Sequence, residues 1–82
     1  MSEHQLSEQA KSLKHGIYRH YKGGVYQVLG VCRHSETLEE MVVYIPMYGQ
    51  YHWWVRPLGM FFETVEVDGQ TKARFEYIGQ NH

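Results

Sequence analysis

Turn-forming residues divide most of this chain into segments of strand length. Between these residues, apolar and polar side chains alternate, and such alternation is typical of strands. The interruptions are Lys22-Gly23-Gly24, the polar run 34–39, Pro46, Tyr48-Gly49-Gln50, Pro57 and Asp68-Gly69. They predict strands over 17–21, 25–34, 40–45, 51–56, 64–67 and 72–78, with Asp68-Gly69 as a hairpin turn. Five or six short antiparallel strands indicate a mainly β fold, and closing them into a small barrel would remove exposed strand edges.

The segment 25–34 is predicted to be a central strand. Both of its alternating faces are largely apolar, as expected for a strand that is covered on two sides. Gly30, near its middle, indicates a bend or a bulge. Cys32 has apolar neighbours and is expected to be a small buried residue. The segment 58–62 is too short and too glycine-interrupted for a regular helix, so we expect a single 3₁₀ turn there.

Residues 2–15 are predicted to form a short helix that precedes the strands. Ser2 can act as its N-cap with Gln5 completing a capping box, and Gly16 is placed to end it. One narrow apolar stripe follows from Leu6, Ala10 and Leu13. Three apolar positions are too few for a free-standing helix, so it must dock on the rest of the chain or on a partner. The predicted organisation is a helical extension over 1–15 and a β domain over 16–82.

Composition restricts the class of protein further. A chain of 82 residues forms one domain, and its single cysteine excludes an internal disulfide. Eight basic and nine acidic residues give a net charge of −1, so non-specific attraction to nucleic acid or anionic lipid is not expected. The longest nearly apolar run, 41–48, is far shorter than the roughly 18 residues that cross a bilayer. The first 15 residues do not read as a signal peptide, and we expect a cytoplasmic protein.

Several short motifs occur in a fixed order along the chain. They are GIYRHYKG (16–23), YQVLG (26–30), HSET (34–37), VVY (42–44), YG (48–49), WVRP (54–57) and MFFE (60–63). With these motifs, residues 16–78 resemble a family of small bacterial proteins catalogued as domain of unknown function 1653. The resemblance implies an SH3-like β-barrel and implies no particular activity. Residues 2–15 lie outside it.

The chain contains more aromatic rings than a core of this size can bury: seven tyrosines, two tryptophans and three phenylalanines. Trp53 and Trp54 are adjacent in a predicted strand, so their side chains point to opposite faces. One of them is expected to fill the core and the other to lie outside. Exposed aromatic groups tend to mark interaction sites. The alternative is that the tyrosines only cover the barrel, with their hydroxyl groups in water.

We therefore expect a non-enzymatic binding module without a cofactor, whose ligand is a peptide, a protein or a nucleotide-like molecule. SH3-like barrels commonly bind such ligands across aromatic side chains, with arginine for stacking or for anionic groups. The candidate ligand-binding residues are Tyr21, His34, Glu36, Tyr48, Trp54 and Arg56. Arg56 can bind a carboxylate or phosphate, or it can pair with Glu36 or Glu63 and brace the loops.

Two other functions are compatible with the sequence. In a homo-oligomeric structural module, the additional rings and the helix would cover a second copy of the chain. In a small enzyme, His34 would act as a base with Glu36, although the adjacent Ser35 points to the opposite face of an extended chain. His20, His34 and His52 could converge on zinc, but no spacing typical of zinc ligands is present, so we expect no metal site.

Overall fold

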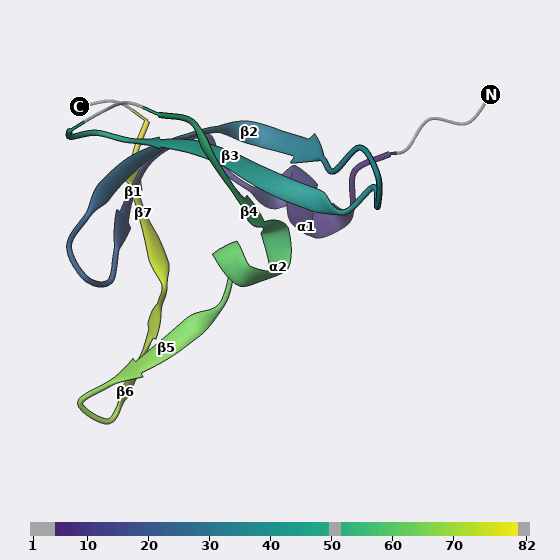
Figure 1. Ribbon diagram of the computed structural model, residues 1–82. Helices are drawn as coiled ribbons and strands as arrows, with labels where there is room; N and C mark the ends of the chain where they lie inside the picture. Colours follow the sequence, from purple (N-terminus) through teal and green to yellow (C-terminus); the bar gives the residue numbers. More distant parts are fainter. Residues whose placement is uncertain (1–4, 50–51, 81–82) are drawn as a thin grey trace.

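The computed structural model describes residues 5–49 and 52–80. Its elements are α1 (Glu8–Ser12), β1 (Gly16–His20), β2 (Val25–Arg33), β3 (Glu40–Pro46), β4 (Trp54–Pro57), α2 (Leu58–Phe61), β5 (Thr64–Val67), β6 (Gln70–Ala73) and β7 (Phe75–Gly79). Five strands form an antiparallel sheet in the order β4-β3-β2-β1-β7, and β5 pairs with β6 in a separate hairpin (Figure 1). The mainly β fold predicted from the turn spacing is confirmed.

The described strands do not close into a barrel. Within the described part of the chain, β4 pairs only with β3, and β7 pairs only with β1. The segment 72–78, expected as one strand, divides at Arg74 into β6 and β7, which belong to different sheets. Because the chain changes direction there, the β5–β6 hairpin projects away from the sheet and leaves the β4 edge uncovered (Figure 1).

The predicted glycine bulge is present in β2. The pairing register between β2 and β3 shifts between Val28 and Gly30. A bulge increases the local twist of a strand. The strand β2, which lies between β1 and β3, is visibly curved (Figure 1). The curvature gives the sheet a concave inner face, and the core lies on that face. Cys32, which was expected to be buried, is only half-buried.

The N-terminal helix is shorter than predicted. Its N-cap is Ser7, whose hydroxyl accepts a hydrogen bond from the Ala10 N–H, and the predicted cap Ser2 lies outside the described residues. Ala10 and Leu13 are buried in the same core cluster as the sheet residues, whereas Leu6 is 38% exposed. The helix therefore docks on its own sheet. Gly16 opens β1 instead of ending the helix.

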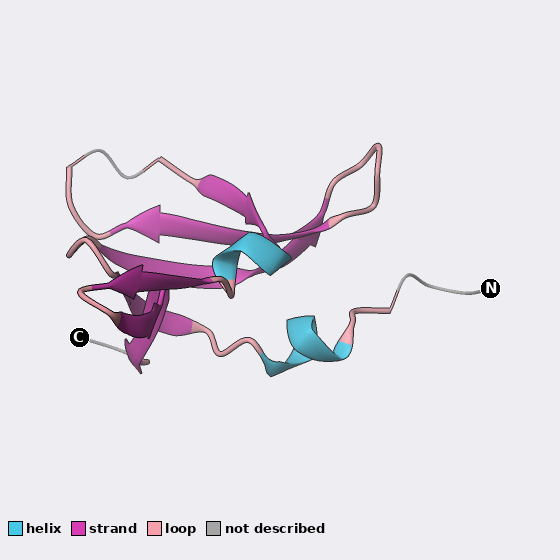
Figure 2. Cartoon of the chain, turned by 90° about the horizontal axis from the view of Figure 1, so that it is seen from below, coloured by secondary structure: helices cyan, strands magenta, loops and turns pink. Residues whose placement is uncertain are grey.

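The segment predicted as a 3₁₀ turn is a single α-helical turn, α2. The Phe62 N–H donates to the Leu58 carbonyl at 3.2 Å, which is the four-residue spacing of an α-helix. The turn buries Leu58 and Phe61 against the concave face, and the Phe61 ring stacks on Phe75 with centroids 4.3 Å apart. From below, α2 lies over the middle of the strands and α1 lies beside the sheet (Figure 2).

Neither tryptophan fills the core, so the expectation that one of them does is wrong. Trp53 is 73% exposed and Trp54 is 54% exposed. Trp54 is the first residue of the edge strand β4, and Trp53 directly precedes that strand. Smaller rings fill the core instead, namely Tyr18, Tyr44, Phe61 and Phe75. None of the described helices is long and apolar enough to span a membrane.

Candidate functional site

A hollow opens at the end of the concave face where β3 leads into its turn. We call it the aromatic hollow. Its volume is about 360 Å³, and it is lined by Tyr26, Tyr44, Pro46, Tyr48, Gly49, Trp54 and Arg56. Strand pairing assembles this lining, because Tyr26 lies opposite Pro46 and Tyr44 lies opposite Trp54. Cross-strand partners share one face of a sheet. Four aromatic rings therefore converge here, from β2, β3, β4 and the turn that follows β3.

Two phenol groups meet at the rim of the aromatic hollow. The hydroxyl groups of Tyr26 and Tyr48 are 3.2 Å apart and share a hydrogen bond. The Tyr26 ring also packs edge-on against Tyr44, with centroids 5.4 Å apart. The hydrogen bond with Tyr48, together with burial, raises the pKa of Tyr26 to about 12. The Tyr26 phenol is therefore neutral at physiological pH, and it offers a ligand a polar contact without charge.

Among the described residues that line this hollow, Arg56 is the one that carries a charge. Its Nε–H donates to the Tyr44 hydroxyl at 3.4 Å, and its guanidinium carbon lies 5.4 Å from the centre of the Phe75 ring. The predicted pairing with Glu63 is not made, because Glu63 pairs with Arg74 at 3.2 Å. None of the described residues that line the hollow is acidic. The guanidinium is thus held by rings beside an uncharged cavity.

A second hollow, the cationic hollow, lies between the β1–β7 edge and the β5–β6 hairpin. It measures about 480 Å³ and is lined by Arg19, His20, Tyr21, Lys72, Ala73 and Glu76. The His20 ring contacts the rings of both Tyr21 and Phe75, with centroids 4.7 and 4.8 Å apart. Burial lowers the pKa of His20, and the neighbouring cations Arg56, Arg74 and Lys22 lower it further. A neutral imidazole therefore stands among positive charges.

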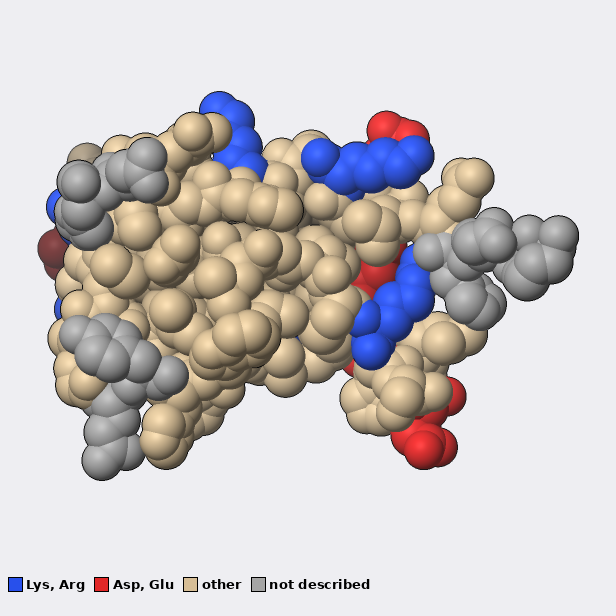
Figure 3. All heavy atoms as spheres, turned by 90° about the horizontal axis from the view of Figure 1, so that it is seen from above, with Lys and Arg blue, Asp and Glu red and all other residues tan. Residues whose placement is uncertain are grey.

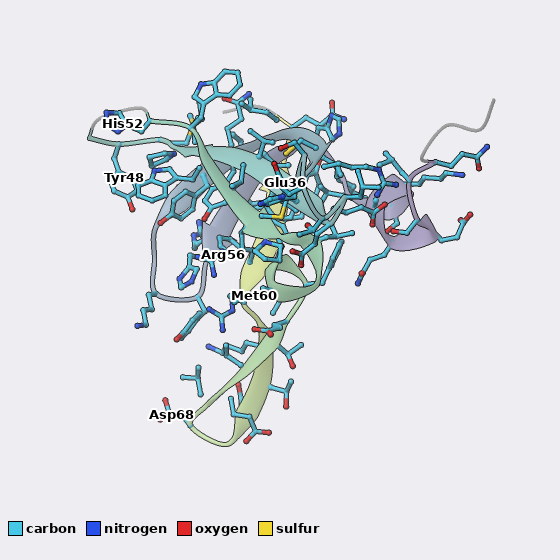
Figure 4. All side chains as sticks on the ribbon, turned by 45° about the vertical axis from the view of Figure 1, so that its right-hand side comes forward. Glu36, Tyr48, His52, Arg56, Met60 and Asp68 are labelled. Carbon is cyan, nitrogen blue, oxygen red and sulfur yellow. The ribbon has the colours of Figure 1, made fainter. Side chains whose placement is uncertain are left out.

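The predicted site residues divide into three groups. Tyr48, Trp54 and Arg56 come together in the aromatic hollow, and Tyr21 lines the neighbouring cationic hollow. His34 and Glu36 join neither, because they lie in the loop between β2 and β3, at the opposite end of that hairpin (Figure 1). Figure 4 shows Asp68 at the tip of the β5–β6 hairpin, far from both Tyr48 and Arg56.

His34 has a structural role in its loop. Its Nδ1 accepts hydrogen bonds from the backbone N–H groups of Glu36 at 3.0 Å and Thr37 at 3.3 Å. The Thr37 hydroxyl in turn accepts from the Glu39 N–H at 3.2 Å. These bonds hold the connection between β2 and β3, so the pairing of His34 with Glu36 is between ring and backbone. In residues 5–49 and 52–80, no three His, Cys, Asp or Glu side chains gather in a way that could hold a metal ion.

Besides Gly49, three residues that line the aromatic hollow were not selected from the sequence: Tyr26, Tyr44 and Pro46. Each has the signal that was used for Trp54, since each is an aromatic or ring-bearing residue at an inward position of a strand. The missing information was the register, which places Tyr44 opposite Trp54 and Tyr26 opposite Pro46.

Comparison with known proteins identifies the family. Residues 16–77 match the model of a family described as "Protein of unknown function (DUF1653)". The chain belongs to this family. Among solved structures, the chain is similar to the crystal structure of a DUF1653 protein from Bordetella bronchiseptica, at 37% identity and a TM-score of 0.80. The similarity covers 87% of this chain and 94% of that one. No curated protein matches the chain. All residues that line the two hollows fall within the segment that matches the DUF1653 model, whereas α1 precedes it.

Proposed function

We propose that this DUF1653 protein is a non-enzymatic binding module that receives a flat group of its ligand in the aromatic hollow. The observation that supports this function best is the exposure of Trp54. More than half of its surface is open to solvent at the mouth of a cavity lined by three tyrosines. An exposed ring is a large apolar surface with few rotatable bonds, so it contributes contact area at a low entropic cost.

The charge of the lining supports a ligand that carries an anionic group near its ring. Arg56 is the charged residue of the lining, and its Nε is already bonded to Tyr44. That bond and the Phe75 ring fix the direction of the guanidinium, and its terminal nitrogen atoms remain as donors. A preoriented guanidinium favours a carboxylate or a phosphate, which it can bind with two parallel hydrogen bonds.

The test compares two tryptophans that differ mainly in their position. Benzoate and indole serve as probes, because they present a flat ring with and without a carboxylate, and amide chemical shifts in NMR report where each one binds. We expect shifts around Tyr26, Tyr44 and Tyr48 for benzoate. We expect Trp54→Ala to weaken benzoate binding about tenfold, as for the loss of one stacking ring. The matched control is Trp53→Ala, which removes a ring that is more exposed and does not line the hollow. Equal effects of the two substitutions would overturn the proposal.

A homo-oligomeric module is the second candidate, and the β4 edge favours it. Val55 is 52% exposed on β4, which among the described strands pairs with β3 alone, and Trp53, directly before β4, is 73% exposed. Seen from above, the centre of the molecular surface is almost free of charged side chains (Figure 3). Uncharged surface beside an open strand edge is suited to a second copy of the chain. Sedimentation equilibrium distinguishes the cases: a dimer that Val55→Lys dissociates favours the oligomer, and a monomer at high concentration contradicts it.

A further inference from the structure

The basic residues of this chain are unevenly distributed. Five of its eight lysines and arginines surround His20, although the net charge is −1. Arg19 and Lys72 line the cationic hollow. The others come from different directions and act on the His20 imidazole: Lys22 from the turn after β1, Arg56 from β4 and Arg74 from the point where β6 gives way to β7. Among the described residues, the acidic groups placed here are Glu76, which lines the hollow, and Glu63, which pairs with Arg74.

Phe75 connects this positive region to the aromatic hollow. Its ring touches His20 on the side of the cationic hollow, at a centroid distance of 4.8 Å. It also touches Tyr26 and Tyr44, at centroid distances of 5.8 and 5.9 Å, on the side of the aromatic hollow. The Arg56 guanidinium lies over the same ring at 5.4 Å. The buried Phe75 ring therefore contacts lining residues of both hollows, and Arg56, which lines the aromatic hollow, lies over the same ring.

The backbone also fixes the positive groups in place. The Lys22 N–H donates to His20 Nδ1 at 3.2 Å, which directs the other ring nitrogen, Nε2, away from the turn. The Tyr21 N–H donates to the Arg74 carbonyl at 2.9 Å and so holds β1 against the start of β7. Backbone hydrogen bonds thus anchor the turn that carries Lys22 and the junction that carries Arg74. Several donors at one place favour a multiply charged anion over a single charge.

We propose that this protein binds a nucleotide unit, with its base stacked on Trp54 and Tyr48 in the aromatic hollow and its phosphate beside Arg56, His20 and Lys22. The inference rests on the proposed function and names the ligand class of the same site. A base presents a flat ring that every aromatic side chain can stack on. A phosphate presents several oxygens to arginine, lysine and imidazole donors. The shared chemistry is a base attached to a phosphate, whether in a free nucleotide or in a single strand.

A double helix does not fit this geometry. Its bases are stacked inside the duplex and expose only their edges in the grooves, so they cannot enter a hollow that takes a ring face. With a net charge of −1, the protein also lacks the broad positive field that duplex binding requires. A single nucleotide or an unpaired strand has an accessible base, and its phosphate needs only the local group of cations around His20.

The test uses adenosine 5′-monophosphate, adenosine and inorganic phosphate as probes, with tryptophan fluorescence and NMR shifts as readouts. We expect the monophosphate to bind about tenfold more tightly than either fragment, because it engages both hollows. Arg56→Met and Trp54→Ala should each weaken it about tenfold. The control Lys11→Met changes the net charge as Arg56→Met does, but on α1, and should leave binding unchanged. Equal affinity for adenosine and its monophosphate would overturn the inference.

A second readout uses the unmodified protein and so does not depend on how the variants fold. A bound phosphate offsets the cations around His20, and the pKa of its imidazole should therefore rise when adenosine 5′-monophosphate is present, as followed by the ring proton shifts. An unchanged His20 titration with the probe bound would overturn the phosphate position.

Further probes distinguish a free nucleotide from a single strand. They also distinguish failure of the nucleotide inference from failure of the proposed function. Stronger binding of an oligouridylate strand than of uridine 5′-monophosphate assigns the site to single strands, and equal binding assigns it to free nucleotides. A duplex that binds as well as the strand would contradict the stacked base. If benzoate binds and requires Trp54 while no nucleotide does, the proposed function stands and the nucleotide inference fails. If no probe requires Trp54, both fail.

Discussion

The Arg56 guanidinium lies 5.4 Å above the centre of the Phe75 ring, and its Nε–H donates to the Tyr44 hydroxyl at 3.4 Å. A charged group from an edge strand is thereby joined to two buried rings of the core. The contact stabilises the β4 edge and at the same time fixes a cation between the two hollows. Folding stability and ligand binding are therefore linked at one side chain, and substitutions can separate the two effects.

Replacing Arg56 should destabilise the protein as well as weaken binding. Arg56→Met loses the interaction with the Phe75 ring and the bond to Tyr44, which together contribute about 1 kcal/mol to the free energy of unfolding. Arg56→Lys keeps the charge over the ring but loses the planar donor, so it should lower the free energy of unfolding by less than Arg56→Met does. Urea unfolding measures both, with Lys11→Met as the surface control. An Arg56→Met protein as stable as the wild type would show that the ring contact contributes nothing.

The phenol pair at the rim should give Tyr26 an unusual alkaline titration. The hydrogen bond with Tyr48 and burial raise its pKa to about 12 in the folded protein, from an ordinary value of 10.0. The stabilisation from this neutral phenol is complete below pH 10.0 and is lost as the pH rises through about 12. NMR of the tyrosine Cζ carbons resolves the residue. Tyr48→Phe should lower the titration midpoint of Tyr26. An unchanged midpoint would show that the hydrogen bond does not raise the pKa of Tyr26.

Gly16 should tolerate no side chain. Its φ of 143° is unfavourable for other residues, and an added Cβ would lie 2.6 Å from the Gly79 carbonyl oxygen and 3.0 Å from the Gln80 Cα. Both neighbours are backbone atoms at the β1–β7 pairing, so they cannot move aside. We expect Gly16→Ala to cost roughly 2 kcal/mol or more in thermal or urea unfolding.

Gly59 provides the matched control for Gly16. An added Cβ at Gly59 meets nothing within 4 Å, and the residue lies in the α2 turn. Gly59→Ala should therefore be neutral or stabilise the protein by about 0.5 kcal/mol, because alanine favours helix. Similar losses for both variants would contradict the close approach at Gly16.

The attachment of α1 should depend on acid pH. The Glu40 carboxylate accepts hydrogen bonds from the Ser7 hydroxyl at 2.6 Å and the Ser7 N–H at 2.7 Å, and Arg33 lies 3.6 Å away. These partners, Ser7 first, hold the pKa of Glu40 below its ordinary value of 4.5. Its contribution to stability is thus complete above pH 4.5 and is lost as the pH falls through the lower value of the folded state.

Two substitutions isolate this contact. Ser7→Ala should cost about 1 kcal/mol at neutral pH through loss of the helix cap, and Glu40→Gln should reduce the acid sensitivity of unfolding. The double variant should lose less than the sum of the two, since both remove one contact. Additive losses would show that the cap and the carboxylate act independently.

The sequence predicted local features of the backbone well. It predicted much less well which side chains are buried and whether the sheet closes into a barrel. Asp68-Gly69, Gly23-Gly24 and Gly30 impose turns or a bulge wherever they occur, so the strands and the hairpin could be predicted from them. Alternation separated the faces of Trp53 and Trp54, but it could not show that the core ends before reaching either ring. Closure of the barrel depends on the change of direction at Arg74. No glycine, proline or other turn-forming residue at that position indicates such a change.

The candidate site was predictable only in part, for a related reason. Trp54 and Arg56 share a face through their spacing alone, and Tyr48 is close to them in sequence. His34 and Glu36 were grouped with them because the sequence did not show which strand ends lie together, and the β2–β3 hairpin places them at its far end. The cations around His20 come from three separate stretches of the chain, around residues 19–22, 56 and 72–74, so their convergence depends on the tertiary fold.

The division of the chain at Arg74 has a mechanical consequence for the cationic hollow. The β5–β6 hairpin is joined to the sheet through Arg74, whose backbone N–H donates to Glu63 at 2.9 Å and whose carbonyl accepts from Tyr21 at 2.9 Å. All four residues of β6 are exposed, and little packing opposes rotation of the hairpin about this junction. Such a rotation carries Lys72 and Ala73 toward or away from His20. The angle between the β5–β6 hairpin and the sheet therefore sets the width of the cationic hollow.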